Sequence, residues 1–123
     1  MLSIIIPTYN NLEYLKICLK SLKKNSQLQH EIILHVNDGS DGTLKFAKEN
    51  NIPHSFSVNN VGLCTAINTA VKKASSDLLL YAHDDMYFCP NWDNYLLNEI
   101  NKIDHNLYYF SGTMIEKNSA HIS

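Results

Sequence analysis

The sequence has no long hydrophobic run. Its apolar stretches reach about five residues, far short of the roughly 20 residues that a membrane-spanning helix needs. The first four residues also lack the basic start and cleavage site that mark a secretory signal peptide. We therefore expect a cytoplasmic protein with no transmembrane segment.

Positive charge is also scarce. The 123 residues carry 10 basic and 12 acidic side chains, which gives a net charge of −2. This balance offers no excess of cations to neutralise a phosphate backbone, so it argues against a nucleic-acid partner. The three cysteines are widely spaced, form no metal-ligand pair and are typical of a reducing compartment. We expect Cys64 and Cys89 to lie in or near the core rather than to act as nucleophiles.

Short apolar runs alternate with segments of helical periodicity along the chain. Helices are predicted from about Leu12, over residues 43–50, after Gly62 and from Pro90. The alternation predicts one α/β domain, a three-layer sandwich with a mostly parallel, Rossmann-like sheet. We expect this domain to cover residues 1–112 and to be followed by a polar tail, residues 113–123. The predicted strands cover residues 2–7, 31–37, 54–58, 78–82 and 107–111.

Polar loops follow the first, second and fourth predicted strands. Right-handed crossovers bring the carboxyl ends of parallel strands to one edge of the sheet, so these loops converge there. Tyr9 offers a ring face on which a base can stack, and Asp38 offers an acceptor for a base N–H or a ribose hydroxyl. These two residues favour a nucleotide as the ligand.

Asp84 and Asp85 form an adjacent pair of carboxylates at the end of the fourth strand. Such a pair suits a divalent cation, a sugar hydroxyl or acid–base chemistry, or it is a plain polar strand end. The sequence has no glycine-rich phosphate loop of the GxGxxG or Walker type. Phosphate charge would therefore have to be met by Mg²⁺ or Mn²⁺ at these carboxylates.

Four sequence blocks carry a family resemblance. They are SIIIPTYNN at residues 3–11, VNDGSDGT at residues 36–43, NVG with AIN at residues 60–68, and YAHDD at residues 81–85. In this order and near this spacing they resemble the amino-terminal half of a family-two glycosyltransferase, an inverting group with the GT-A fold. The resemblance covers residues 2–112.

The resemblance implies a role for each matching residue. Thr8 and Tyr9 would line the base pocket, and Asp38 would hydrogen-bond the base. Asn60 and Gly62 would lie near the base or the phosphates. The nucleotide-sugar site would comprise Pro7, Thr8, Tyr9, Asp38, Asn60, Gly62 and Asp84, with Asp85 as the ligand of Mn²⁺ or Mg²⁺.

The chain departs from the family pattern in two ways. Ala82 stands where the commonest pattern has an aspartate, so metal binding rests mainly on Asp85. In the family the general base comes from the second half of a domain roughly twice this length, and this chain ends soon after its fifth predicted strand. No residue is assigned as the base, because His83 is more typical of a hydrogen-bonding neighbour.

The resemblance implies transfer of a sugar from a nucleotide-diphosphate donor, with UDP favoured, to an acceptor hydroxyl on a glycan or another compound. A half domain would leave one flank of the sheet uncovered, which favours self-association or a partner chain. One alternative is a non-catalytic nucleotide-sugar module, or half of an enzyme that a partner completes. Another is a different α/β domain, such as a receiver, but we find no convincing lysine at a later strand end.

Overall fold

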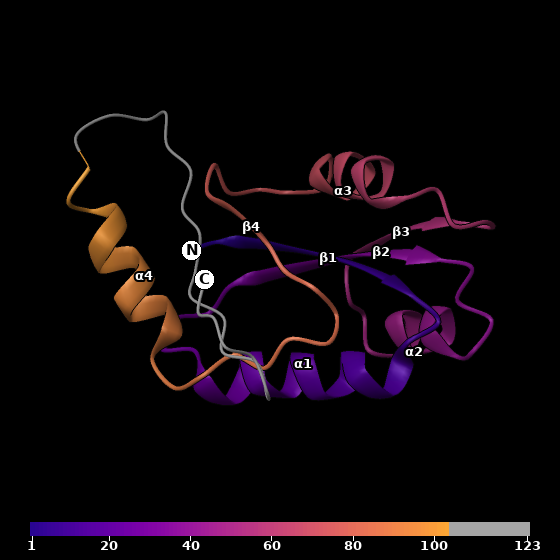
Figure 1. The fold of residues 1–123 in the computed structure, drawn as a ribbon, viewed down its shortest axis with the longest axis horizontal. Helices are drawn as coiled ribbons and strands as arrows, with labels where there is room; N and C mark the ends of the chain where they lie inside the picture. The colour runs from indigo at the N-terminus through magenta and orange to yellow at the C-terminus, as the bar shows by residue number, and fades with distance from the viewer. Residues whose placement is uncertain (104–123) are drawn as a thin grey trace, which may run out of the picture.

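The protein is an α/β domain built on one parallel sheet. The computed structural model describes residues 1–103, so the strand predicted over residues 107–111 and the tail predicted from residue 113 lie outside it. Four parallel strands lie in the order β3-β2-β1-β4 (Figure 1). The elements are β1 (Ser3–Tyr9), α1 (Leu12–Asn25), β2 (Glu31–Asn37), α2 (Thr43–Glu49), β3 (His54–Ser57), α3 (Leu63–Val71), β4 (Leu79–Tyr81) and α4 (Trp92–Ile100).

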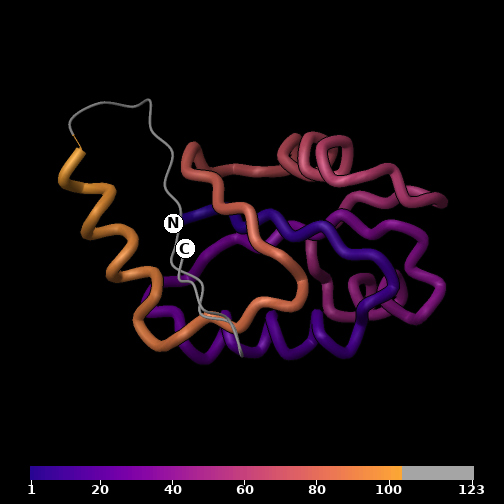
Figure 2. Tube along the Cα trace, viewed as in Figure 1, coloured from indigo at the N-terminus to yellow at the C-terminus, as the bar shows by residue number. Residues whose placement is uncertain are grey.

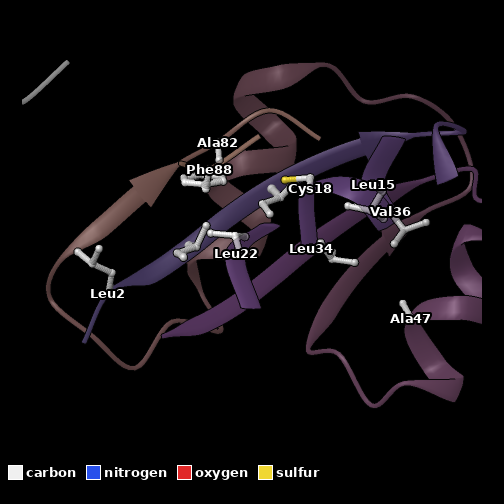
Figure 3. Packing of buried hydrophobic residues seen from close by; sticks show 11 residues of the cluster. Leu2, Leu15, Cys18, Leu22, Leu34, Val36, Ala47, Ala82 and Phe88 are labelled. Atoms are coloured by element: carbon white, nitrogen blue, oxygen red, sulfur yellow. The ribbon is translucent and has the colours of Figure 1, made fainter. Parts of the chain in front are cut away.

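The sheet is covered on both faces, which confirms the three-layer prediction. Ile4 and Ile6 of β1 belong to the larger core cluster, into which α1 sends Leu15 and Cys18 (Figure 3). Ile5 points to the opposite face and packs in a second cluster with residues of α3. Side chains alternate between the two faces of a strand, so three consecutive isoleucines are what a strand buried on both faces requires.

Strand β1 is longer than the sequence predicts. Pro7 lies inside the strand rather than closing it, and the strand continues through Tyr9. The amide of Ser3 donates to the carbonyl of Leu78, just before β4, and Ile5 accepts from the amide of Ala82, just after it, so odd-numbered residues of β1 bond on the β4 side. Because β4 ends opposite Ile5, Pro7 has no strand partner on the side where its missing N–H would point.

The chain beyond β4 runs back along α1 before it enters α4 (Figure 2). Backbone groups of this segment bind side chains of α1. Phe88 donates its amide to Ser21 Oγ at 2.9 Å and accepts from Asn25 Nδ2 at 2.7 Å. These bonds fix the segment that carries the two adjacent aspartates to a rigid helix. No helix among residues 1–103 is long and apolar enough to cross a membrane.

The cysteines differ from our expectation. Cys64 and Cys89 are exposed, and the core cysteine is Cys18. The buried residues of α3 are Ala66 and Ala70, and Cys64 lies near the start of the same helix on its exposed side. Burial, with the nearby carboxylates of Asp84 and Asp85, raises the pKa of the Cys18 thiol to about 12.

A buried carboxylate anchors α4 at the end of the sheet where the strands begin. Asp93 is fully buried and accepts from the amides of Gln27 and Leu28 at 3.0 and 2.9 Å. It also accepts from Nε2 of His30 at 2.8 Å, and Nδ1 of that ring accepts from the amide of Leu2 at 3.1 Å. Burial alone would raise the pKa of Asp93, but these donors hold the pKa below its ordinary value.

Candidate functional site

A polar cleft of about 360 Å³ lies where β1 and β2 end. Six of the eight residues that the sequence predicts for the site line this cleft, and Asp38 and Asp85 lie outside its lining. The lining residues are Pro7, Thr8, Tyr9, Asn11, Asn37, Asn60, Gly62, Leu63 and Asp84.

A second hollow of about 620 Å³ lies at the opposite end of the molecule, between α1 and the start of β2. It is larger but is lined mainly by apolar side chains and contains none of the predicted site residues. In parallel α/β sheets ligands bind beyond the carboxyl ends of the strands, so the smaller cleft is the candidate site.

Asp84 is held between two elements that are distant in sequence. Its Oδ2 accepts from Thr8 Oγ1 at 2.8 Å, and its Oδ1 accepts from Asn11 Nδ2 at 3.1 Å. Thr8 is buried at the end of β1, and Asn11 precedes the first turn of α1. The carboxylate is therefore oriented by the protein, and each oxygen keeps a lone pair for a ligand.

Asp38 lies beside the cleft, in the left-handed region of backbone conformation with φ of 62°. Its Oδ2 accepts from Asn10 Nδ2 at 3.0 Å, and its Oδ1 accepts from the amide of Ser40 at 3.2 Å. Hydrogen bonds from Asn10 and Ser40 lower the pKa of Asp38, so it is a carboxylate at neutral pH. Gly39 follows with φ of +75°, and a Cβ there would lie 2.6 Å from Val36 Cγ1.

Tyr9 lines the cleft from the end of β1, and Asn60 and Gly62 line it from the loop of residues 59–62. The side chain of Tyr9 is 53 % exposed, so its ring is available for stacking. Asn60 Oδ1 accepts from the amide of Gly62 at 3.0 Å, which closes a tight turn just before α3. Gly62 has φ of +84°, and a Cβ built on it meets no atom within 4 Å. The backbone at Gly62 is thus open to close approach by a ligand.

Two asparagines in the cleft were given no site role by the sequence. Asn11 occupies the N-cap position of α1 but makes no capping bond with its side chain. The amide of Leu12, the first residue of the helix, binds Asp41 Oδ2 at 3.1 Å, and the side chain of Asn11 binds Asp84. Asn37 is buried at the end of β2 and binds backbone groups on both sides of the cleft.

His83 lies near the two aspartates but does not line the cleft. Its exposed ring packs against Tyr81, whose hydroxyl lies 3.2 Å from Nδ1. Burial and then the carboxylates of Asp84 and Asp85 raise the pKa of the Tyr81 phenol. The partner recorded for the His83 ring among residues 1–103 is thus the Tyr81 hydroxyl rather than a carboxylate of the site.

The donor set near Asp85 fits a hard divalent cation. No group of three or more histidine, cysteine, aspartate or glutamate side chains that could hold a metal occurs within residues 1–103. Asp85 is exposed, and Asp84 is nearby with unused lone pairs. Mg²⁺ is typically bound by one or two carboxylates together with waters and substrate phosphates, and two adjacent aspartates fit that kind of donor set.

The fold and the cleft together define a parallel α/β domain with its candidate ligand site at the carboxyl edge of the sheet. The family model for glycosyl transferase family 2 matches residues 3–123, and the chain belongs to that family. This confirms the family predicted from the four sequence blocks.

Curated relatives point the same way. An uncharacterized glycosyltransferase of Rickettsia typhi is 32 % identical over 108 residues, which cover 85 % of this chain and 33 % of that protein. The uncharacterized glycosyltransferase YwdF of Bacillus subtilis is 32 % identical over 107 residues, covering 84 % of this chain and 39 % of that protein. The chain thus spans about a third of the length of these two relatives.

Solved structures confirm a fold of the GT-A type. The structure of S. aureus TarS 1-349 in complex with UDP is similar with a TM-score of 0.69 at 25 % identity, covering 82 % of this chain and 32 % of that one. The complex of TarS 1-349 with UDP-GlcNAc gives a TM-score of 0.64 at 27 % identity and covers 84 % and 31 % of the two chains. The similarity falls on the amino-terminal half of such a domain.

Proposed function

We propose that this chain forms the donor-binding part of a glycosyltransferase that uses a nucleotide-diphosphate sugar, with a UDP-sugar favoured. The observation that supports this most strongly is the single cleft that gathers Thr8, Tyr9, Asn60, Gly62 and Asp84 at the carboxyl edge of the sheet. Family membership and the UDP and UDP-GlcNAc complexes of TarS support the same donor class.

The cleft residues divide between the parts of the donor. The exposed ring of Tyr9 stacks on the base, with Pro7 and Thr8 beneath it. Asp38, ionised and already oriented by Asn10, accepts from an N–H of the base. Asn60 and Gly62 approach the phosphates, where the open backbone at Gly62 and the start of α3 favour negative charge.

Asp84 and Asp85 serve the sugar end of the donor. Asp84, fixed by Thr8 and Asn11, accepts from a hydroxyl of the ribose or the donor sugar. Asp85 holds Mn²⁺ or Mg²⁺, which would supply positive charge to the leaving diphosphate.

The reaction we propose is in-line attack of an acceptor hydroxyl on the anomeric carbon, with inversion. A new glycosidic bond forms, the bond from the anomeric carbon to the diphosphate breaks, and the diphosphate leaves with the electron pair. Residues 1–103 orient the donor and hold its leaving group. None of these residues is assigned as the base that takes the proton from the acceptor, which is typically a glycan or another hydroxyl compound.

A second function has its own support. No residue among 1–103 is assigned as the general base, so a non-catalytic nucleotide-sugar-binding module, or half of an enzyme that a partner chain completes, is the alternative. The two functions differ in one measurement. Sugar transfer or donor hydrolysis by this chain alone would exclude the non-catalytic module.

The test of the proposed function is calorimetric titration with UDP, GDP and their sugar derivatives, with and without Mn²⁺. We expect one of these nucleotides to bind, and to bind more tightly with Mn²⁺ than without it. Asp38→Ala should weaken this binding at least about tenfold in either condition, since a hydrogen bond to a charged group is worth roughly 1.5–3 kcal/mol. Asp85→Ala should abolish only the gain from Mn²⁺. Asp77→Ala, an acidic residue outside the cleft, is the control, and unchanged affinity in both site variants would refute the proposal.

A further inference from the structure

The wall of the cleft formed by residues 59–62 has almost no apolar anchor. Val58 is 74 % exposed, Val61 is 39 % exposed and Leu63 is 51 % exposed. Hydrophobic burial therefore contributes little to the position of this wall. Its placement depends on hydrogen bonds to the ends of β2 and β3.

Asn37 supplies the central bonds. Its side chain is 4 % exposed, at the last position of β2. Oδ1 accepts from the amide of Val61 at 3.0 Å, and Nδ2 donates to the carbonyl of Thr8 at 3.3 Å. One carboxamide thus joins the two sides of the cleft, the loop before α3 and the end of β1.

A hydrogen-bond chain from within the sheet orients this carboxamide. Ser57 Oγ lies 3.1 Å from Asn37 Oδ1 and 2.7 Å from the carbonyl of Asn59. It also lies 3.0 Å from His35 Nε2, and His35 Nδ1 lies 2.7 Å from Ser55 Oγ. When Nε2 carries the proton it donates to Ser57, which leaves the single hydroxyl proton of Ser57 for the loop or for Asn37.

We propose that Asn37 is a positioning residue of the donor site: it holds residues 59–62 at the distance from β1 that fits the nucleotide. This inference rests on the proposed function, because it assigns Asn37 a role in donor affinity through Val61 and its neighbours. Asn37 bonds to Val61 in the wall and to the carbonyl of Thr8 at the end of β1, and residues of the wall would contact the ligand.

Amide hydrogen exchange tests the first half of the inference without any ligand. Asn37→Ala removes the acceptor of the Val61 amide, and we expect exchange at Val61 to speed up at least about tenfold. Asn37→Asp keeps an acceptor oxygen for the Val61 amide but replaces the donor to Thr8 by a second acceptor oxygen, so exchange at Val61 should be slower than in Asn37→Ala. Ser3→Ala is the matched control, since Ser3 is a buried hydrogen-bonded residue at the opposite end of β1.

Titration with UDP at a temperature where every variant is folded tests the second half. We expect Asn37→Ala to weaken affinity about tenfold, the loss of roughly two ordinary hydrogen bonds, and Ser3→Ala to leave affinity unchanged. A wild-type rate of exchange at Val61, or faster exchange with unchanged affinity, would overturn the inference. If Asn37→Ala does not fold, Ser57→Ala replaces it, with faster exchange at Val61 as the supporting result and an unchanged rate as the refuting one.

The two proposals fail in different ways. If wild-type protein binds neither UDP nor GDP, with or without Mn²⁺, the proposed function is wrong. Exchange at Val61 then still decides whether Asn37 holds the wall. If wild-type protein binds and the variants behave as the control does, the proposed function stands and the role of Asn37 is wrong.

Discussion

The two ends of the sheet use acidic side chains in opposite ways. At the end where the strands begin, Asp93 is fully buried, and its oxygens accept from three backbone amides, those of Gln27, Leu28 and Asn94, and from His30. At the end where the strands finish, Asp84 accepts one side-chain hydrogen bond on each oxygen and borders a cleft. The carboxylate of Asp93 is used for structural hydrogen bonds, whereas the carboxylate of Asp84 is oriented by the protein and can still accept a hydrogen bond from a ligand.

The difference shows what makes an acidic residue a candidate for function. Both aspartates are hydrogen-bonded, so bonding alone does not separate them. The donors differ, because fixed backbone amides surround Asp93 whereas the rotatable side chains of Thr8 and Asn11 hold Asp84. A site that must accept a ligand needs oxygen atoms with spare lone pairs facing open space, and only the carboxyl edge provides them here.

Replacing Asp93 by asparagine should produce the largest effect on stability. The new amide group would face the amides of Gln27 and Leu28 or the ring of His30, leaving a buried donor without an acceptor. We expect the free energy of unfolding to fall by about 3 kcal/mol, since a hydrogen bond to a charged group is worth roughly 1.5–3 kcal/mol. Urea denaturation of the full chain measures this. Nucleotide affinity below the new melting temperature should not change.

The same substitution at Asp84 should reverse that pattern. The hydroxyl of Thr8 can rotate to accept from the new amide group, so we expect a stability loss of about 1 kcal/mol or less. Affinity for the nucleotide sugar should fall about tenfold, because a charged acceptor for its hydroxyls is lost. Denaturation and titration of Asp84→Asn beside Asp93→Asn measure both quantities. An equal stability loss in the two variants would contradict the inference that Asp93 serves mainly stability and Asp84 mainly ligand binding.

Local sequence pattern was sufficient for the architecture. The run Ile4-Ile5-Ile6 is apolar on both strand faces, and it predicts a central strand covered on both sides, as observed. The convergence of Thr8, Tyr9 and Asp84 also followed from strand order, because parallel strands end at one edge. Family resemblance then added Asn60 and Gly62, which no local pattern singles out.

What the sequence could not supply depends on contacts between distant residues. Asn11 and Asp84 are 73 residues apart, and their bond requires the fold to bring the start of α1 beside the segment that follows β4. The place of Pro7 within β1 requires knowing that β4 ends opposite Ile5. The exposure of Cys64 depends on which side of α3 the sheet occupies. These three features depend on how distant segments pack together, and the residue pattern within one segment does not predict that packing.

The smallest effect we predict is a pH dependence that arises at the cleft end. His35 is 1 % exposed and contacts only the neutral hydroxyls of Ser55 and Ser57 through its ring nitrogens, and burial lowers its pKa below the ordinary 6.5. The unfolded chain then binds a proton that the folded protein does not. Stability from this group is therefore complete above pH 6.5 and falls as the pH drops from 6.5 toward the lowered value.

Urea denaturation of wild-type protein and His35→Gln between pH 7.5 and 5.5 measures this contribution. Glutamine can bond both serines but does not titrate, so the variant should lose less stability on acidification than the wild type does. We expect the difference between the two slopes to amount to about 1 kcal/mol or less over this range. Parallel slopes would show that His35 is not the titrating group, and the hydrogen-bond chain to Asn37 would then be independent of pH.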